Sequence, residues 1–247
     1  MSDVTLLLLG AVVFLIAGSV KGLVGIGLPT AAISLLTIVI DPRTAIAMGL
    51  VPIIVANAWQ MWTMGDIRGS FRRYWPFALV IGLSVFVTVT LSADVSDQVI
   101  FLALGISIVA FAVLNLRFVM PVIPDRYDFA AQLGFGTAAG ILGGLSGVWV
   151  APVIMYLSAR RVEKDEFVRA TGLLLFFGGI PFVTAYVQQG FVTSEIAGIS
   201  LALVIPTLIG FGLGARLRRR LSNEKFRKVL LYVFLLLGLN LLRRGLF

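Results

Sequence analysis

One lysine, Lys21, stands between two adjacent apolar runs, at the start of the segment KGLVGIGLPT (residues 21–30). Its ammonium group could act as the counter-charge of an anion, which is the interpretation we favour. Alternatively, its aliphatic stem could carry the charge out to an aqueous interface. Gly25 and Gly27 permit a tight turn and the close approach of a ligand, while Pro29 suits the first turn of a restarting helix. Because a helix that restarts here would aim free N–H groups at a bound group, the segment predicts an anion site.

The second half of the chain carries a related segment, GGLSGVWVAP (residues 143–152). Gly22 pairs with Gly144, and Gly25 with Gly147, at an offset of 122 in a chain of 247 residues. Each half therefore holds one glycine-rich segment, although only the first contains a lysine. We expect the two segments to face each other and to form one anion site.

Polar residues within the apolar runs are further candidate contacts for a ligand. Asn57 and Gln60 lie three residues apart, so they face one way on a helix, and Thr171 belongs to the corresponding run of the second half. Each could instead make an interhelical hydrogen bond, and Trp149 could serve in packing or as an interfacial anchor. The complete predicted binding site comprises Lys21, Gly22, Gly25, Gly27, Pro29, Thr30, Asn57, Gln60, Gly144, Ser146, Gly147, Trp149, Pro152 and Thr171.

Several kinds of chemistry are excluded by what the chain lacks. There is no cysteine and no histidine, which removes the commonest transition-metal ligands. All twelve acidic residues lie outside the uncharged runs, whereas a cation carrier keeps a carboxylate inside its helical bundle. Gly25 and Gly27 have no strand-turn-helix context, so a dinucleotide site is rejected. We expect no metal, no cofactor and no catalytic residue, and therefore no enzyme.

Composition places the chain among membrane proteins. Hydrophobic residues make up 59% and charged residues 13%, and the mean hydropathy is +1.03. A single soluble core cannot bury so many apolar segments on all sides. The net charge of +8 is explained by an excess of Lys and Arg in cytoplasmic loops, so no nucleic-acid partner is expected. The expected partners are a small anion and the lipid bilayer; a homodimer is left open.

The lengths of the uncharged runs indicate membrane spans with two exceptions. A span needs about 20 apolar residues, and the start MSDV lacks the basic region of a cleaved signal peptide. Regions 4–40 and 129–159 are too long for one pass, the second being about 46 Å as a straight helix. Each either crosses once with an overhang or folds back as a hairpin. The runs are residues 4–20, 22–40, 44–65, 74–93, 98–116, 129–159, 170–194, 196–215 and 229–242.

The distribution of basic residues favours the hairpins. If region 129–159 enters and leaves on one side, one side of the membrane collects 16 Lys and Arg residues in its loops and the other side collects 3. A single crossing would divide them 7 to 12. Because cytoplasmic loops are enriched in Lys and Arg, we predict hairpins in both regions and both termini outside.

Further matches between the halves indicate a duplication. AMGL (47–50) resembles ATGL (170–173), and ALVI occurs at 78–81 and 202–205. Corresponding loops carry opposite charge patterns, which is typical of an inverted-topology repeat. We therefore predict one all-α polytopic transporter domain over residues 1–247, with repeats at about 4–123 and 126–245. Each repeat would contain a broken or re-entrant helical hairpin plus three transmembrane helices.

The two glycine-rich segments, with GGLSGVWVAPVIMYL followed by DEFVRATGLLLF, resemble the TauE/SafE family of sulfite and organic-anion exporters. The resemblance covers essentially the whole chain. Many relatives have consecutive glycines where this chain has Gly25, Ile26, Gly27 and Leu28, and Trp149 replaces a glycine. The resemblance implies a carrier in the bacterial inner membrane that moves sulfite, a sulfonate or a related small organic anion outward.

Together these observations predict a secondary transporter that exports a small oxyanion by alternating access, as its two halves rock against each other. Two alternatives stay open. The first is a channel-like facilitator for the same anions, and the second, from a different class, is a membrane-embedded assembly or scaffold protein whose glycines only tighten helix packing.

Overall fold

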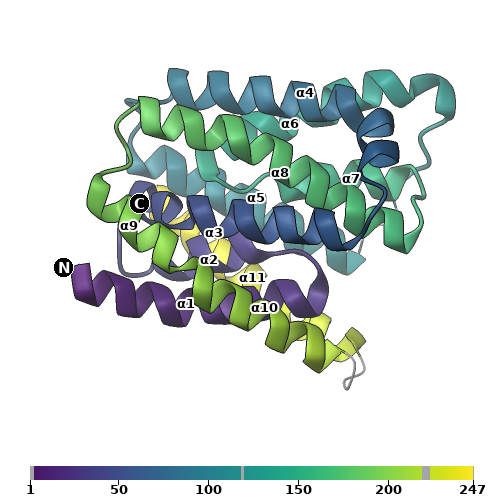
Figure 1. The fold of residues 1–247 in the computed structure, drawn as a ribbon. Helices are drawn as coiled ribbons and strands as arrows, with labels where there is room; N and C mark the ends of the chain where they lie inside the picture. The colour runs from purple at the N-terminus through teal and green to yellow at the C-terminus, as the bar shows by residue number, and fades with distance from the viewer. Residues whose placement is uncertain (1–2, 118–119, 219–222, 247) are drawn as a thin grey trace.

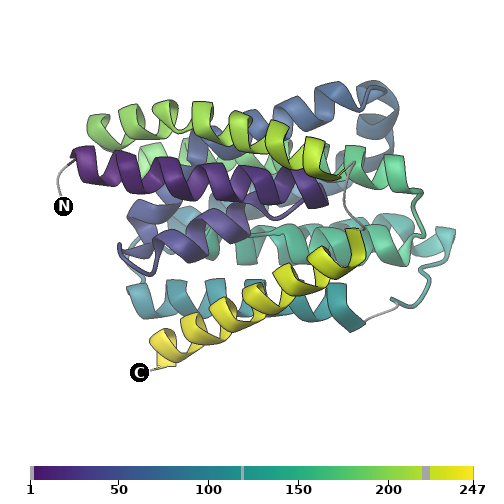
Figure 2. The same cartoon turned by 90° about the horizontal axis from the view of Figure 1, so that it is seen from below.

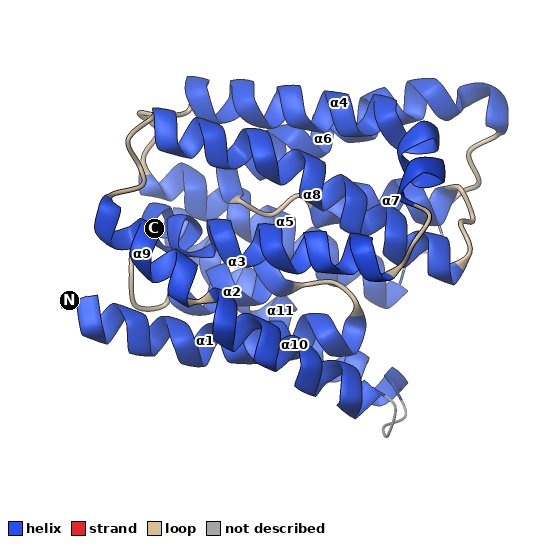
Figure 3. Ribbon diagram, in the orientation of Figure 1, coloured by secondary structure: helices blue, strands red, loops and turns tan. Residues whose placement is uncertain are grey.

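The computed structural model describes residues 3–117, 120–218 and 223–246, and over these residues the chain forms helices and loops but no strand (Figure 3). Seven of the described helical segments are long and apolar enough to cross a bilayer. The predicted class, an all-α polytopic membrane protein, is therefore confirmed. The helices run along one common direction, and both chain termini lie at the same end of the bundle (Figures 1 and 2).

The helices follow one another as two comparable series. The first series is α1 (Asp3–Val24), α2 (Leu28–Leu36), α3 (Pro42–Thr63), α4 (Ile67–Leu91) and α5 (Asp97–Arg117). The second series is η1 (Asp125–Tyr127), α6 (Asp128–Ser146), α7 (Val150–Ala159), α8 (Lys164–Gln188), α9 (Ser194–Ala202), α10 (Val204–Arg218) and α11 (Asn223–Leu246).

The two over-long regions are each a long helix followed by a short one that packs against it. The first break runs through Gly25 and Gly27, whose φ angles are +88° and +96°, and Pro29 is the second residue of α2. The second break begins at Gly147, whose φ angle is +70°. Side chains other than glycine rarely adopt these angles. The short helices α2 and α7, of 9 and 10 residues, are about 14 Å long, half of what a bilayer core requires.

Two helices begin before the uncharged runs to which they correspond. Helix α4 begins at Ile67, not at residue 74, and α8 begins at Lys164, not at residue 170. Both helices extend their first turns through charged residues, since long basic side chains can reach water from a helix end. The predicted span 196–215 lies within one candidate membrane span, Ser194–Leu217, whose helix is interrupted at Leu203 between α9 and α10. Pro206 explains this break, because its ring clashes with the carbonyl group four residues earlier and it offers no N–H.

Glycines bring two pairs of helices into backbone contact. A Cβ atom at Gly22 of α1 would lie 2.1 Å from the carbonyl oxygen of Phe211 on α10. Similarly, a Cβ atom at Gly140 of α6 would lie 2.3 Å from the Cβ atom of Ser84 on α4. Small residues at such crossings let membrane helices approach closely, where dispersion and Cα–H···O contacts stabilise the pair.

Large apolar side chains on the outside of the bundle complete a lipid-facing surface. On α1, Val12 and Ile16 are exposed, while Phe14 and Ala17 on the opposite face are buried. Leu79 and Leu83 are likewise exposed on α4. Helices that are apolar on both faces are suited to hydrocarbon on one side and a packed interior on the other.

The glycine contact between α1 and α10 can be tested with a matched pair of substitutions. A Cβ atom at Gly210 would lie 2.1 Å from the carbonyl oxygen of Leu15, whereas one at Gly212 would meet nothing within 4 Å. We expect Gly210→Leu to lower the melting temperature of the detergent-purified protein by about 5 °C or more, because overpacking costs about 1–3 kcal/mol. Gly212→Leu should leave it nearly unchanged. Equal melting temperatures for the two variants would contradict the close contact.

Candidate functional site

Lys21 lies in the last turn of α1 and is almost completely buried, with 1% of its surface exposed. Its Nζ atom donates a hydrogen bond of 2.6 Å to Oδ1 of Asn57 on α3. No carboxylate among the described residues forms an ion pair with it. A buried ammonium group without a counter-ion is costly, by several kcal/mol, so this position favours the arrival of an anion.

A cavity of about 350 Å³ adjoins Lys21. It is bounded by the end of α1, the end of α3, the start of α8 and the middle of α10. Thr63, the last residue of α3, and Met64, which follows it, are exposed where the cavity reaches the end of the bundle. The residues around the cavity are Lys21, Gly22, Gly25, Gln60, Thr63, Met64, Val168, Phe211 and Ala215.

Two amides of α3 supply polar groups at this place. Gln60 donates from Nε2 to the carbonyl oxygen of Val168 at 2.7 Å, which ties α3 to α8. The Nδ2 atom of Asn57 and the Oε1 atom of Gln60 are buried and have no hydrogen-bond partner. Buried polar atoms are nearly always paired. The unpaired Nδ2 atom of Asn57 is therefore available to donate a hydrogen bond to an oxygen atom of a ligand.

The residues of the first break occupy different surroundings. Gly25 borders the cavity, but its N–H donates to the carbonyl oxygen of Lys21 at 2.7 Å. Gly27 precedes α2 and faces Val20 and Phe234 in the packed interior. Pro29 is in the first turn of α2. Thr30 is fully buried, and its Oγ1 atom has no partner.

The second break lines a separate and much smaller cavity of about 10 Å³, which Gly147 and Trp149 share with Ile33 of α2 and with residues of α3 and α8. The hydroxyl group of Ser146 hydrogen-bonds to the backbone of neighbouring residues. It donates to the carbonyl oxygen of Leu142 at 2.6 Å and accepts from the N–H of Val148 at 3.1 Å. The buried Nε1 atom of Trp149 has no partner. The two breaks therefore do not border one common cavity.

The remaining predicted residues of the second half lie in helix contacts. Gly144 packs against Thr88 of α4, and Pro152 is the third residue of α7. Thr171 is buried and donates to the carbonyl oxygen of Phe167 within its own helix. Of the predicted set, the structure thus brings Lys21, Gly22, Gly25, Asn57 and Gln60 together, and it places the other residues elsewhere.

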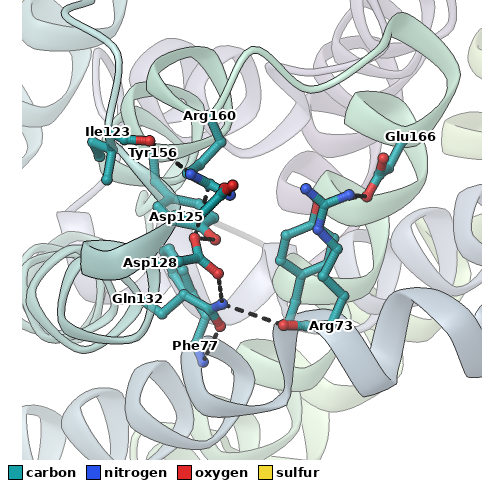
Figure 4. Close-up of polar contacts among 10 residues, drawn as sticks. Arg73, Phe77, Ile123, Asp125, Asp128, Gln132, Tyr156, Arg160 and Glu166 are labelled. Carbon is teal, nitrogen blue, oxygen red and sulfur yellow. Dashed lines mark hydrogen bonds and ion pairs between the residues drawn. The ribbon is translucent and has the colours of Figure 1, made fainter.

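A polar network joins α4, α6, α7 and α8 near the ends of these helices (Figure 4). Arg73 and Tyr74 both contact Oε1 of Glu166 at 2.6 Å. Asp128 accepts from Tyr156 at 2.7 Å and lies 2.8 Å from Nε of Arg160. These arginines are paired with carboxylates, so they offer no unneutralised charge to a ligand.

Additional hydrogen bonds complete this network. Gln132 donates from Nε2 to Asp128 and to the carbonyl oxygen of Arg73, and its Oε1 accepts from Phe77 N (Figure 4). The hydrogen bond with Asp125, more than any other influence, raises the pKa of Arg160 above its ordinary value. The network links the start of α6 and the end of α7 to α4 and α8.

Sequence reasoning missed several parts of the site. Thr63 lies one helical turn beyond Gln60, so extending the predicted polar face of α3 would have found it. Val168, Phe211 and Ala215 come from helices that only the tertiary fold brings to Lys21. The ion pairs of Asp128 and Glu166 were also missed, because both residues were assigned to loops.

Comparison with known proteins identifies a family for this chain. The chain matches the family described as Sulfite exporter TauE/SafE over residues 10–241. No curated protein and no solved structure gave a match. The family match covers all the described helices except the first turns of α1 and the last turn of α11. The chain is a multi-pass membrane protein and belongs to the TauE/SafE sulfite exporter family.

Proposed function

We propose that the protein is a secondary transporter of the bacterial inner membrane that exports a small oxyanion by alternating access. The observation that carries this proposal is Lys21, a fully buried lysine whose hydrogen-bond partner is the neutral amide of Asn57 and which borders a cavity of about 350 Å³. Sulfite, a sulfonate or a related small organic anion would supply the missing negative charge.

The polar groups around the cavity suit an oxyanion better than a cation. On the cavity wall, the ammonium group of Lys21 has only donors, and Gln60 has one unpaired acceptor, Oε1. Behind Lys21, the unpaired Nδ2 atom of its partner Asn57 is a further donor. No acidic residue borders the cavity. Charge-assisted hydrogen bonds to an anionic oxygen are about twice as strong as neutral ones, so the bound anion would be held mainly by Lys21 and oriented by Asn57.

The packing of the helices supports an inverted-topology repeat. If α1, α3, α4 and α5 correspond to α6, α8, α10 and α11, the contact of α1 with α10 is matched by the contact of α6 with α4, and each of these pairs joins the two halves. Helices α3 and α8, and likewise α5 and α11, then pack against their own counterparts. Exchange of the halves about a pseudo-two-fold axis would leave this pattern unchanged, as alternating access requires.

The cavity adjoins the basic end of the bundle. Thr63 and Met64 immediately precede the turn into α4, whose first two turns carry Arg68, Arg72 and Arg73. Because loops rich in Lys and Arg stay in the cytoplasm, we assign this end to the cytoplasm and both termini to the opposite side. The cavity would then load an anion from inside, and the anion would leave along the inside-negative potential. A proton coupled to export would have to travel on the substrate or on Lys21.

The charge of the site can be tested with an isosteric substitution. Asn57→Asp keeps an oxygen beside Lys21 but adds a negative charge that neutralises the ammonium group. We expect sulfite efflux from loaded proteoliposomes to fall at least tenfold, about 1.4 kcal/mol, with little change in thermal stability. Gln188→Glu, at an exposed position of α8, makes the same chemical change and should retain full flux. Undiminished flux in Asn57→Asp would exclude Lys21 as the counter-charge.

Removal of the lysine separates the candidate functions. Lys21→Ala should reduce sulfite efflux by about tenfold or more, because an uncompensated anion is costly to desolvate. Lys21→Arg should retain a measurable share. An electrogenic facilitator would pass anion current without exchange, and a scaffold protein would pass no anion even in the wild type.

Membrane orientation can be read from cysteine labelling, since the natural chain has no cysteine. We expect a membrane-impermeant maleimide to label Asp3→Cys and Leu246→Cys from outside intact cells. Arg72→Cys, at an exposed position near the start of α4, should react only after the cells are opened. Protection of both terminal positions in intact cells would reverse the assigned orientation.

A further inference from the structure

Two cavities occupy corresponding places in the two halves of the chain. The cavity beside Lys21 is bordered by Gly22 and Thr63. A second cavity is bordered by Gly144 and Tyr186, which follow those residues at offsets of 122 and 123 in the sequence. Under the inverted-repeat arrangement, this second cavity is the counterpart of the first at the opposite end of the bundle.

The two cavities differ strongly in size. The Lys21 cavity has a volume of about 350 Å³, whereas its counterpart has about 10 Å³, enough for a single water molecule at most. The small cavity is closed by Arg43 from α3, by Ser92 and Val95 from the α4–α5 connection, and by Phe191 from the α8–α9 connection. Of these two cavities, the one at the basic end is thus wide, and the one at the end that holds the termini is nearly filled.

Arg43 brings a positive charge to the closed cavity. Its Nη2 atom donates to the carbonyl oxygen of Val95 at 2.7 Å, and its guanidinium carbon lies 4.5 Å from the ring centroid of Phe191. Over the described residues, Arg43 has no carboxylate partner, and the nearby Asp41 instead accepts from the backbone N–H of Thr44. The arginine is held by neutral groups that an anion could replace.

The other side chains of the small cavity fit the same role. Tyr186 is 3% exposed and borders the cavity, so its hydroxyl group is available as a second donor once the cavity opens. No acidic side chain borders this cavity either. By contrast, Arg73, Arg160 and Arg169 each lie within 4 Å of a carboxylate.

We propose that Arg43 and Tyr186 form a second oxyanion-binding site, which faces the outside when the transporter opens there and is closed in the present conformation. This inference rests on the proposed function, because the same anion would pass from Lys21 to Arg43 during export. In the closed state, Arg43 seals the outer path through its contacts with Val95 and Phe191. On opening, the planar guanidinium group would exchange these contacts for the oxygens of the anion.

The test measures sulfite exchange separately at the two faces, in right-side-out and inverted membrane vesicles. We expect Arg43→Gln to raise the half-saturating sulfite concentration at the outer face about tenfold and to change that at the inner face less than about twofold. A merely structural arginine would alter both faces alike. Arg43→Lys, which keeps the charge, should fall between wild type and Arg43→Gln at the outer face and serves as the test if Arg43→Gln does not fold.

Arg244 provides the matched control. Its guanidinium group also donates to a backbone carbonyl oxygen, that of Thr37, and lies 4.2 Å from the ring centroid of Phe101. However, Arg244 does not border either cavity. Arg244→Gln should therefore leave both half-saturating concentrations unchanged. If Arg43→Gln behaves like Arg244→Gln while the wild type exchanges sulfite, the second site is refuted and the proposed function stands. If the wild type exchanges no anion at either face, the proposed function fails and this inference fails with it.

Discussion

Backbone N–H and C=O groups must find partners inside a bilayer, and this constraint governs where the chain can be interrupted. Both helix breaks are packed against other helices: Gly27 of the first faces Phe234 of α11, and Gly147 of the second faces Ile33 of α2 and Ile46 of α3. At the first break, Gly25 still donates to Lys21, and at the second, Ser146 accepts from the backbone N–H of Val148. Unpaired polar atoms of Asn57 and Gln60 lie beside Lys21, which borders the cavity.

The arrangement of charge follows from the same low-dielectric surroundings. At the basic end, the arginines of the polar network are matched by Asp125, Asp128 and Glu166, which neutralises them where the helices meet water. Lys21 and Arg43 are different, because their partners are an amide and backbone carbonyl groups. Lys21 is buried and Arg43 is half-buried, and an uncompensated charge inside the bundle of a membrane protein usually marks a path for ions or substrates.

Local patterns in the sequence were sufficient for part of this structure. The glycines at residues 25 and 147 predicted breaks because their backbone angles are costly for other residues, and the spacing of Asn57 and Gln60 predicted their common face. How deeply each helix break is buried, and which helices contact it, could not be predicted from local patterns. The second break has the same glycine pattern as the first, yet it borders a different cavity, because its position depends on how α6 packs on α4. Val168 and Phe211 lie beside Lys21 only because helices that are distant in the sequence pack together. The periodicity of a single helix does not predict such contacts.

The glycine contacts also determine which parts of the bundle can move as units. Helix α1 of the first half is in backbone contact with α10 of the second half, and α6 of the second half with α4 of the first. Contacts this close resist sliding, because the backbones leave no room for adjustment. A rocking motion that preserves them must divide the bundle into two bodies that each contain helices from both halves. Under the proposed rocking mechanism, the two sequence repeats and the two moving bodies would therefore be different partitions of the same chain.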